Sequence, residues 1–578
     1  MEHLDAGAGP SLGRTLARLF AEFANLIEIE GSDPRKASAY RRAALALRDA
    51  TEPVERLAAE GRLTAIAGIG PILAAKITEF VRTGQIAALE ALRAQVPAGV
   101  ASLLAVRGVG PKLAAGAWRG LGITSVEGLR AAATDGRLAA LPGVGLARAA
   151  KVLQAIALAA DVHLLATALP LAAAVAAALA ETPGILGAEI AGEARRGCPI
   201  VRAAEIVAAG TPDAVAAALW ALSLPWATPP GLDAAAAGPW PEVLGSLQEG
   251  PTVRVVVCPV EAFGTALLWS TGSTTHLTEI AQWRRLHGEA AAPLPLAPDE
   301  ESAYRALGLP WIAPELREGW GEVAAAAAGR LPTRLVQTRD LQGDLHCHST
   351  FSDGTGSVEA MAAAARARGY RYVAITDHSR SLVVAHGMSL AAVREQRLRI
   401  DALNAASTDG FVLLQGAEVE ILRDGSLDYP DEVLAGLDFC VASLHNAYNQ
   451  STEELTARLL RAVEHPAVDL LGHPTGRRLG KRDPYPVDVP RLVAAARAHG
   501  KAIEVNGSPE RLDLDGTYNR LLPEAGVPAS LDSDAHSPAG LAAAEYAVLT
   551  ARRGGIGPAA VLNTKSLEEL RAWKARRQ

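Results

Sequence analysis

The sequence predicts a multidomain chain with an all-helical amino-terminal part and a carboxy-terminal α/β barrel. Its 578 residues exceed the length of an ordinary single domain. Residues 1–160 combine amphipathic helical stretches with three similar glycine-containing turns. Residues 338–578 alternate apolar, strand-like runs with helical stretches, and several of these runs end in a histidine or a carboxylate. Strand ends that carry polar groups and converge on one rim are typical of an α/β barrel.

Composition restricts the classes of function. The net charge is −7, which by itself does not indicate a nucleic-acid-binding protein. The charge is unevenly distributed, because residues 1–160 hold 19 Lys and Arg against 14 Asp and Glu, whereas the remainder holds 37 against 49. A mildly basic amino-terminal part on an acidic body is compatible with local phosphate binding, and other features must support that function.

No membrane segment or disulfide framework is expected. The alanine-rich run of residues 164–180 contains Pro170 and is only weakly apolar, so we expect an ordinary helix there. The first residues lack the cationic and apolar segments of a secretory signal. The cysteines form no C-x-x-C pair, which is typical of a protein from a reducing cytoplasm. They are Cys198, Cys258, Cys347 and Cys440.

The amino-terminal part repeats one pattern three times. Helices are expected over residues 16–29 and 37–48, and the pattern apolar-x-Gly-apolar-Gly then begins at Ile66, Val106 and Leu141. Its glycines permit a tight turn that exposes N–H groups at a helix start, where they can hold a phosphate without reading a base. One such turn is common in helical proteins, but three copies resemble helix-hairpin-helix motifs and imply DNA binding. The glycines concerned are Gly68, Gly70, Gly108, Gly110, Gly143 and Gly145.

Residues 1–95 are expected to form a first domain, and residues 96–160 a second, fingers-like one. The first resembles the lyase domain of polymerase beta over residues 10–95. In that family a lysine after the first hairpin forms a Schiff base with an abasic sugar, and Lys76 matches it, with Lys36 and Tyr40 as supporting neighbours. Such a lysine needs a lowered pKa. The alternative is that Lys76 contacts only phosphate or solvent.

The middle part, residues 161–330, resembles the palm and thumb of family X DNA polymerases. Residues 192–197 (Gly-Glu-Ala-Arg-Arg-Gly) resemble the family's G-S-x-R-R-G, and residues 263–273 resemble its nucleotide loop. Residues 304–319 resemble the thumb of the bacterial branch, PolX, which also carries a carboxy-terminal barrel domain. The resemblance implies an α+β nucleotidyltransferase fold. It assigns phosphate contacts to Arg196, Thr271, Gly272 and Ser273.

The middle part departs from that family at the acids that carry the chemistry. The family holds two Mg²⁺ ions with an Asp-x-Asp pair and a third Asp, and these positions fall on Ala203, Glu205 and Thr252. Two-metal transfer needs carboxylates that hold the ions close together. At the position where the family has a serine that contacts the triphosphate, this chain has Glu193. A carboxylate at that position would repel a polyphosphate. We therefore expect the polymerase activity to be lost and no Mg²⁺ in the palm, with weak phosphate binding retained.

After a linker of residues 331–337, the barrel contains a candidate metal centre. His346 and His348 alternate along one strand, so their side chains lie on one face, and Asp353 follows closely. Imidazoles with a carboxylate suit Zn, Mn or Fe. A single H-x-H can occur by chance, but further candidate ligands follow later apolar runs. Together the nine candidates are more than one tetrahedral zinc can bind. They predict two or three metals, an arrangement for phosphoester hydrolysis. The later candidates are His378, Glu418, His445, His473, Asp534 and His536.

These motifs resemble the PHP (polymerase and histidinol phosphatase) domain over about residues 338–575. They are H-x-H, the T-D-H of residues 376–378, the S-L-H of 443–445, the G-H-P of 472–474 and the D-S-D-A-H of 532–536. The resemblance implies a distorted seven-stranded α/β barrel with a trinuclear site. Asp344 and Asp377 are expected to lie outside the ring of metal-binding residues and to orient them. Cationic rim residues (Arg380, Arg477, Arg478 and Lys481) are candidates for phosphate contacts or are simply solvated.

The function expected is DNA repair by a cytoplasmic metal-dependent phosphoesterase. The barrel would act as a 3′–5′ exonuclease or 3′-phosphatase, and as a possible abasic-site endonuclease, on gapped, nicked or 3′-ended duplex held by the other parts. Three alternatives stay open at this point: an active family X polymerase that fills gaps in base excision repair, a non-catalytic DNA-binding scaffold and a small-molecule phosphatase. The sequence does not identify a partner polymerase or another repair protein.

Overall fold

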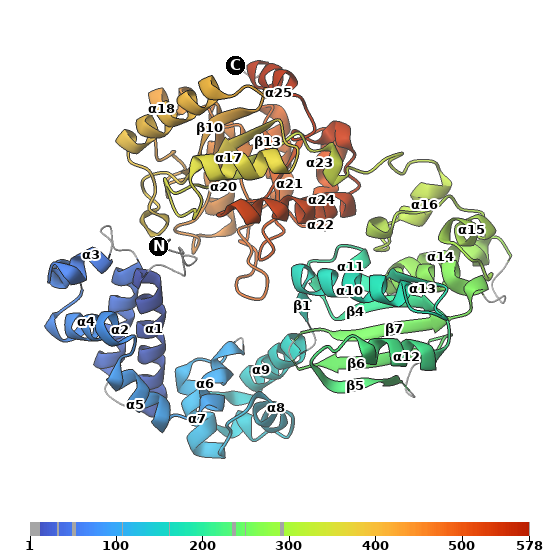
Figure 1. Cartoon of the computed structure of the whole chain (residues 1–578), viewed down its shortest axis with the longest axis horizontal. Coiled ribbons are helices and arrows are strands. Elements are labelled where there is room, and N and C mark those ends of the chain that lie inside the picture. The colour runs from blue at the N-terminus through green and yellow to red at the C-terminus, as the bar shows by residue number, and fades with distance from the viewer. Residues whose placement is uncertain are drawn as a thin grey trace, which may run out of the picture. The chain divides into compact units, whose positions relative to one another are not determined.

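The computed structural model describes residues 12–31, 34–48, 54–66, 68–106, 108–160, 162–233, 238–248, 250–288 and 294–576. The chain divides into two compact units, Met1–Asp161 and Val162–Gln578, which are drawn in Figure 1. The second unit contains both the sheet of the middle part and the barrel. No helix among the described residues is long and apolar enough to cross a membrane. The side chains of Cys198, Cys258, Cys347 and Cys440 are buried.

The first unit is helical throughout its described residues. Helices α1 and α2 pack side by side, and Phe20, Phe23 and Tyr40 fill the space between them. Short helices that begin after glycine turns continue the unit. The helices are Leu12–Glu30 (α1), Pro34–Arg48 (α2), Val54–Ala59 (α3), Pro71–Thr83 (α4), Ala87–Gln95 (α5), Ala98–Ser102 (α6), Pro111–Leu121 (α7), Val126–Thr134 (α8) and Gly145–Ala160 (α9), with 3₁₀ turns Leu63–Ala65 (η1), Leu103–Ala105 (η2) and Leu138–Ala140 (η3).

A five-stranded mixed sheet forms the centre of the middle part. Its strand order is β2-β4-β7-β6-β5, and β4 and β7 run parallel. Alternate residues of β7 face opposite sides, so Val255 packs beneath α10 and α12 whereas Val256 packs against α13. The elements are His163–Leu164 (β1), Leu165–Ala180 (α10), Gly187–Ile190 (β2), Gly192–Arg195 (α11), Ile200–Val201 (β3), Ala203–Ala209 (β4), Pro212–Ala221 (α12), Trp226–Leu232 (β5), Glu242–Leu247 (β6), Thr252–Cys258 (β7), Val260–Ala262 (η4) and Phe263–Thr271 (α13).

A small helical subdomain follows the sheet. Its helices enclose a separate apolar core around Tyr304 and Ile312. His276 is fully buried there between Glu322 and the Tyr304 hydroxyl, at 2.6 and 3.0 Å. The elements are Thr274–Leu286 (α14), Glu300–Ala306 (α15), Pro314–Leu316 (η5) and Glu322–Ala327 (α16).

The carboxy-terminal part is a seven-stranded parallel barrel, as predicted (Figure 1). The strands neighbour one another in chain order from β8 to β14. The two edge strands also meet, since the N–H of His348 donates to Ala535 O at 2.8 Å and the N–H of Asp534 to His346 O at 3.0 Å. The strands are Gly343–Cys347 (β8), Tyr372–Ile375 (β9), Val412–Glu420 (β10), Phe439–Ser443 (β11), Leu470–Leu471 (β12), Ala502–Asn506 (β13) and Ala529–Asp532 (β14).

Helices cover the barrel between its strands. Several begin at a serine whose hydroxyl accepts a helix N–H, which fixes the helix start. The helices and 3₁₀ turns are Thr338–Asp340 (η6), Val358–Ala367 (α17), Val383–Ala385 (η7), Leu390–Ala406 (α18), Asp431–Ala435 (α19), Thr452–Glu464 (α20), Val489–Ala498 (α21), Gly516–Asn519 (α22), Leu521–Ala525 (α23), Pro538–Ala543 (η8), Ala544–Arg553 (α24), Pro558–Ala560 (η9) and Leu567–Ala575 (α25).

Helix α24 joins the barrel to the middle part. Arg553 donates to the Glu318 carboxylate at 2.6 Å and to the carbonyl of Arg196 at 3.2 Å. Arg552 donates to the Glu315 carboxylate at 2.6 Å. These partly buried contacts connect the barrel directly to the middle part.

Candidate functional site

The barrel brings all nine predicted ligand residues to the carboxyl ends of its strands. His346 lies in β8 and His348 directly follows it, and their ring centroids are 5.2 Å apart. The pleat of β8 therefore places both imidazoles on one side, as expected. The other ligand residues lie in β10 or in the segments after β8, β9, β11, β12 and β14: Asp353, His378, Glu418, His445, His473, Asp534 and His536.

Glu418 lies at the centre of the cluster. Its Oε2 is 2.9 Å from Nδ1 of His378 and 3.4 Å from Nε2 of His346. Its Oε1 is 2.8 Å from Nε2 of His473 and 3.3 Å from Nε2 of His445. One buried carboxylate thus contacts imidazoles from four different strand ends, which suits a ligand shared between ions.

Two aspartates complete the cluster on its other side. Asp353 Oδ1 lies 3.6 Å from Nε2 of His378 and 3.4 Å from Nε2 of His536. Asp534 Oδ1 lies 3.3 Å from Nε2 of His348. Three groups of donor atoms have spacings suited to an ion: His348, Asp353, His378 and His536; His346, His348 and Asp534; and His378, Glu418 and His445.

The donors fit divalent metals because several of them are buried without a hydrogen-bond partner. They include Nε2 of His346, both ring nitrogens of His348, Oδ1 of Asp353 and Oε2 of Glu418. An unpaired buried polar atom costs about 1–3 kcal/mol, and such a cost is relieved when a cation is bound. Imidazole with carboxylate suits Zn, Mn or Fe, and the overlapping groups fit more than one ion.

The histidines differ in pKa in the metal-free protein. Burial lowers the pKa of His348 and of His473 to about 3, so both are neutral and can act as ligands. Burial also disfavours the charged form of His445, but Glu418 outweighs it and raises the pKa of His445 to about 9. The pKa of His536 is likewise raised to about 9, because the nearby carboxylates of Asp353 and Asp534 together outweigh burial.

Two carboxylates behind the cluster were missed by sequence reasoning. Glu504 Oε1 lies 2.7 Å from Nδ1 of His346, and Glu420 Oε2 lies 2.8 Å from Nδ1 of His445. Each contact fixes the ring so that Nε2 faces the cluster. The signal for Glu420 was its position two residues after Glu418 in one strand, which places both on one face. Glu504 lies inside the buried strand β13, where no motif marks it.

Asp344 and Asp377 lie behind the ligand-bearing segments. Asp344 accepts the N–H of His346 at 3.1 Å and that of Ser533 at 3.2 Å. Asp377 accepts the N–H and the hydroxyl of Ser349, at 2.8 and 2.5 Å. Both carboxylates therefore hold the backbone that carries ligands, whereas Glu504 and Glu420 hold ligand rings.

Arg511 is a cation beside the cluster that the sequence did not single out. Its Nε lies 3.3 Å from Oδ2 of Asp534, and its Nη1 is buried without a hydrogen-bond partner. The predicted rim cations have other partners: Arg380 pairs with Asp428, Arg477 with Asp515, and Arg478 and Lys481 with Glu510. Of these five cations, Arg511 is therefore the one that pairs with a residue of the cluster.

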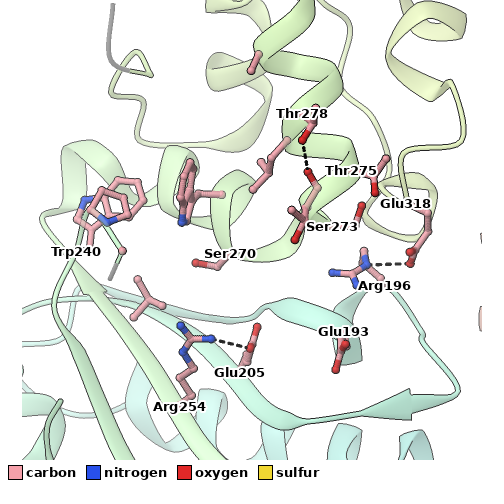
Figure 2. Close-up of a pocket in the computed structure, with 18 of the residues that line it drawn as sticks. Glu193, Arg196, Glu205, Trp240, Arg254, Ser270, Ser273, Thr275, Thr278 and Glu318 are labelled. Atoms are coloured by element: carbon pink, nitrogen blue, oxygen red, sulfur yellow. Dashed lines mark hydrogen bonds and ion pairs between the residues drawn. The ribbon is translucent and has the colours of Figure 1, made fainter. Parts of the chain in front are cut away.

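The middle part contains a cavity of about 1010 Å³ where the resemblance places a nucleotide (Figure 2). In the parallel pairing of β4 and β7, Ala203 lies opposite Thr252 and Glu205 opposite Arg254. The three positions expected to carry acids therefore lie side by side. The methyl side chain of Ala203 cannot bind a metal, and the hydroxyl of Thr252 is a weak ligand.

Glu205 and Glu193 are both engaged by arginines of the cavity. Arg254 Nη1 lies 3.2 Å from Glu205 Oε1, and Figure 2 shows the two side chains pointing at each other. Burial raises the pKa of Glu205, and Arg254 opposes that effect. Glu193 accepts the N–H of Arg202 at 2.8 Å and also pairs with its guanidinium. Because Arg202 balances its charge, Glu193 repels a triphosphate less than the sequence indicated.

The residues expected to contact phosphate in this cavity also form hydrogen bonds and ion pairs with other residues of the protein. Arg196 pairs with Glu318 at 2.9 Å and donates to the carbonyl of Thr271 at 2.7 Å (Figure 2). Thr271 is fully buried, and its hydroxyl accepts from Arg195 at 3.2 Å. After Gly272, the hydroxyl of Ser273 caps helix α14 by accepting the N–H of His276. Phosphate binding here would have to compete with these contacts.

The three glycine turns of the first unit lead into helices, as expected. Gly68, Gly108 and Gly143 have φ angles of +92°, +86° and +77°, a region that favours glycine. Helix α4 follows Gly70 and α7 follows Gly110. The third turn differs, because Gly145 also has a positive φ and is itself the first residue of α9.

Lys76 and Tyr40 lie near the same aromatic ring. The Lys76 ammonium is 5.4 Å from the centroid of Phe23, and the ring of Tyr40 is 4.2 Å from it. Burial raises the pKa of Tyr40 to about 12, so its hydroxyl stays protonated. Lys36, one turn before Tyr40 in α2, is exposed. Lys76 and Tyr40 therefore both lie beside Phe23, and Lys36 lies at the surface.

Known proteins resemble this chain over its helical part, its barrel and its full length. Residues 14–86 match the helix-hairpin-helix domain, residues 100–158 the SAM-like helix-hairpin-helix tandem and residues 344–508 the PHP domain. A Bacillus subtilis (strain 168) protein described as DNA polymerase/3′-5′ exonuclease PolX is 33% identical over 579 residues, which cover 97% of this chain and 99% of that relative.

Shorter proteins described as probable phosphatases also match. One from Thermoanaerobacter sp. (strain X514) is 29% identical over 234 residues, which cover 38% of this chain and 89% of that relative. One from Syntrophotalea carbinolica is 28% identical over 239 residues, which cover 40% of this chain and 94% of that relative.

Proposed function

The chain belongs to the bacterial PolX family, and on this premise we propose that its barrel hydrolyses phosphoester bonds at DNA ends. The observation that carries the proposal is the buried cluster around Glu418, with its overlapping groups of imidazole and carboxylate donors. The activities that we assign to it are 3′–5′ exonuclease, 3′-phosphatase and abasic-site endonuclease. The substrate is gapped, nicked or 3′-ended duplex DNA.

The nine cluster residues would hold two or three divalent ions, with Mn or Zn favoured and Fe as an alternative. Bound ions would supply activation of water and neutralisation of phosphate charge. The protein's own groups set the geometry: Glu504 and Glu420 orient His346 and His445, and Asp344 and Asp377 hold the ligand-bearing backbone. Arg511 offers a positive charge to the substrate phosphate beside Asp534.

The helical region would hold the DNA through its backbone. Each glycine turn presents N–H groups at a helix start, which bind a phosphate without reading a base. We assign residues 1–95 and 96–160 to two helix-hairpin-helix domains, 161–330 to a palm and thumb and 338–578 to the barrel domain. A Schiff-base role for Lys76 is part of this proposal and requires loss of its proton.

We also propose that the middle part no longer transfers nucleotides. Ala203 and Thr252 replace two expected metal-binding acids, and Arg254 neutralises Glu205. A palm of this composition offers Mg²⁺ no pair of bridging carboxylates. The cavity would then serve DNA binding instead of synthesis. A gap-filling polymerase remains the competing function, because the Bacillus subtilis relative is described as both polymerase and exonuclease.

The relatives described as probable phosphatases favour a second candidate function, hydrolysis of small phosphate monoesters. They match about two fifths of this chain and do not match the rest of it. The three glycine turns support DNA over such a substrate. A non-catalytic scaffold would not need a buried set of unpaired ligand atoms. We also propose a cytoplasmic location, since the cysteine pattern of the sequence is typical of a reducing compartment.

The test is a direct comparison of substrates. Purified protein with Mn²⁺ is incubated with end-labelled gapped DNA, with and without nucleoside triphosphates, and separately with p-nitrophenyl phosphate. Release of nucleotides from the 3′ end, at a catalytic efficiency well above that for the small ester, supports the proposal. Hydrolysis of the small ester alone would favour the phosphatase, and hydrolysis of neither would favour the scaffold.

A further inference from the structure

A pair of stacked tyrosines lies at the barrel rim outside the ligand cluster. The rings of Tyr448 and Tyr485 are 5.3 Å apart and inclined by only 15°. Tyr485 is 6% exposed, whereas Tyr448 retains 45% of its surface in solvent. The buried ring therefore supports an exposed one, which offers a flat aromatic surface.

Arg482 adds a positive charge to this surface. Its guanidinium carbon lies 5.2 Å from the centroid of Tyr448 and 5.0 Å from that of Tyr485. Its Nε donates to the carbonyl of Gly476 at 2.9 Å, which holds the side chain in place. A cation beside exposed aromatic rings is typical of surfaces that bind single-stranded nucleic acid.

The stacked pair is fixed to two of the loops that carry metal ligands. Tyr448 follows the ligand His445 by three residues, a reach of at most about 11 Å along the chain. Tyr485 donates its N–H to the carbonyl of Thr475 at 2.7 Å, two residues after the ligand His473. The surface and the cluster therefore belong to the same rim.

The loop that carries Tyr448 is held in a defined conformation. Arg458 donates to the carbonyls of Asn446 and Ala447, at 2.9 and 3.4 Å, and is itself buried. Ala447 has a φ of +53°, which turns the chain just before Tyr448. The exposed ring is consequently presented by a fixed turn, with little conformational entropy left to lose on binding.

We propose that Tyr448, supported by Tyr485 and Arg482, is a stacking site for an unpaired base of the DNA strand whose end lies in the metal cluster. This inference rests on the proposed DNA-end hydrolysis and names the part of the substrate that is recognised. Stacked nucleotides rise about 3.4 Å each, so the chain reach of at most about 11 Å from His445 to Tyr448 corresponds to about three stacked nucleotides from the scissile phosphate. Stacking accepts any base, because every base has a π face.

The test compares Tyr448→Ala with Tyr448→Phe, which keeps the ring. One substrate is a single-stranded oligonucleotide with normal 3′ bases, and the other has abasic residues at its last three positions. We expect Tyr448→Ala to raise KM about tenfold or more on the normal strand and to leave KM on the abasic strand unchanged. Tyr448→Phe should behave like the wild type on both, and kcat should change little.

A binding measurement supplies a readout that does not depend on hydrolysis. Before metal ions are added, an oligonucleotide with a 2-aminopurine base at its 3′ end should lose fluorescence on binding to the wild type and to Tyr448→Phe, but much less on binding to Tyr448→Ala. Equal quenching by all three proteins would overturn the stacking site, as would an equal rise of KM on both strands. Wild-type protein that quenches the probe without digesting DNA would refute the proposed hydrolysis while retaining the stacking site.

Discussion

Arg254 and Glu205 form an ion pair across the parallel strands β7 and β4, with 3.2 Å between Nη1 and Oε1. Arg254 also holds the buried carboxylate of Glu242 at 2.6 Å. Glu205, the one carboxylate at the three expected metal-binding positions, is thereby neutralised by the protein itself. A site for nucleotide transfer would instead need that acid, and two more, to hold metal ions.

The first prediction concerns synthesis. The His346→Ala variant, whose nuclease is silenced, should not extend a gapped primer with Mg²⁺ or Mn²⁺, because Ala203 and Thr252 leave no bridging carboxylates. Loss of such ligands commonly costs several powers of ten, at about 1.4 kcal/mol of barrier per tenfold. Primer extension followed on a gel measures this. Incorporation at an ordinary polymerase rate would show that the palm is active.

A matched control restores the acids. The combined changes Ala203→Asp, Glu205→Asp, Thr252→Asp and Glu193→Ser, introduced into the His346→Ala background, should recover at most a trace of synthesis. Arg254 would still face the restored acids, so full activity is not expected.

The second prediction concerns the carboxylates behind the ligands. Glu504→Gln should weaken metal binding about 10- to 100-fold, because the contact that orients His346 is weakened. Titration of the metal-free protein with Mn²⁺ or Zn²⁺ in a competition assay gives the affinity. Glu545→Gln is the control, since Glu545 pairs with Arg368 at the surface, and it should leave metal affinity unchanged. Equal affinity for all three proteins would refute the role of Glu504.

The third prediction concerns the release of protons when the cluster binds metal. In the metal-free protein the pKa values of His445 and His536 are raised to about 9, so both rings are largely protonated at pH 7. Metal ligation requires neutral imidazole, so loading with metal at pH 7 should release protons. The release should decline as the pH rises through about 9, where the rings are already neutral. A pH-indicator dye in weak buffer detects it, and constant release from pH 7 to pH 10 would contradict the assignment.

The fourth prediction concerns DNA binding by the glycine turns. Affinity should fall steeply with salt and depend little on base sequence, because phosphates are the contact. Gly108→Ala forces an alanine into a φ of +86° and should weaken binding. Gly136→Ala is the matched control, since Gly136 also has a φ of +86° and open space around it but lies outside the three motifs. Fluorescence anisotropy with a labelled duplex compares them, and an equal loss in both variants would point to general destabilisation.

The sequence was sufficient to predict the helical part, the barrel and the residues that meet at its rim. Predicted ligands such as His378 and His473 follow apolar runs, and the topology of a parallel barrel brings such positions together. Glu504 and Arg511 could not be predicted in this way. Their roles depend on the side chains of His346 and Asp534, which lie far from them in the chain.

Ion pairs and ring stacking could not be predicted from the sequence for the same reason. The sequence indicated that Glu205 stood alone and that Glu193 would repel a triphosphate, whereas Arg254 and Arg202 neutralise them. The pairing of Glu205 depends on the register between β4 and β7. The stack of Tyr448 on Tyr485 likewise depends on how two loops meet at the rim.

The central claim is that the barrel cluster hydrolyses DNA while other parts of the chain hold it. The most direct measurement is digestion of end-labelled gapped DNA by the wild type, His346→Ala and Asp534→Ala, with binding of the same DNA measured in parallel. Loss of digestion in both variants, with an unchanged dissociation constant, is the predicted result. Undiminished digestion in both variants would contradict the account.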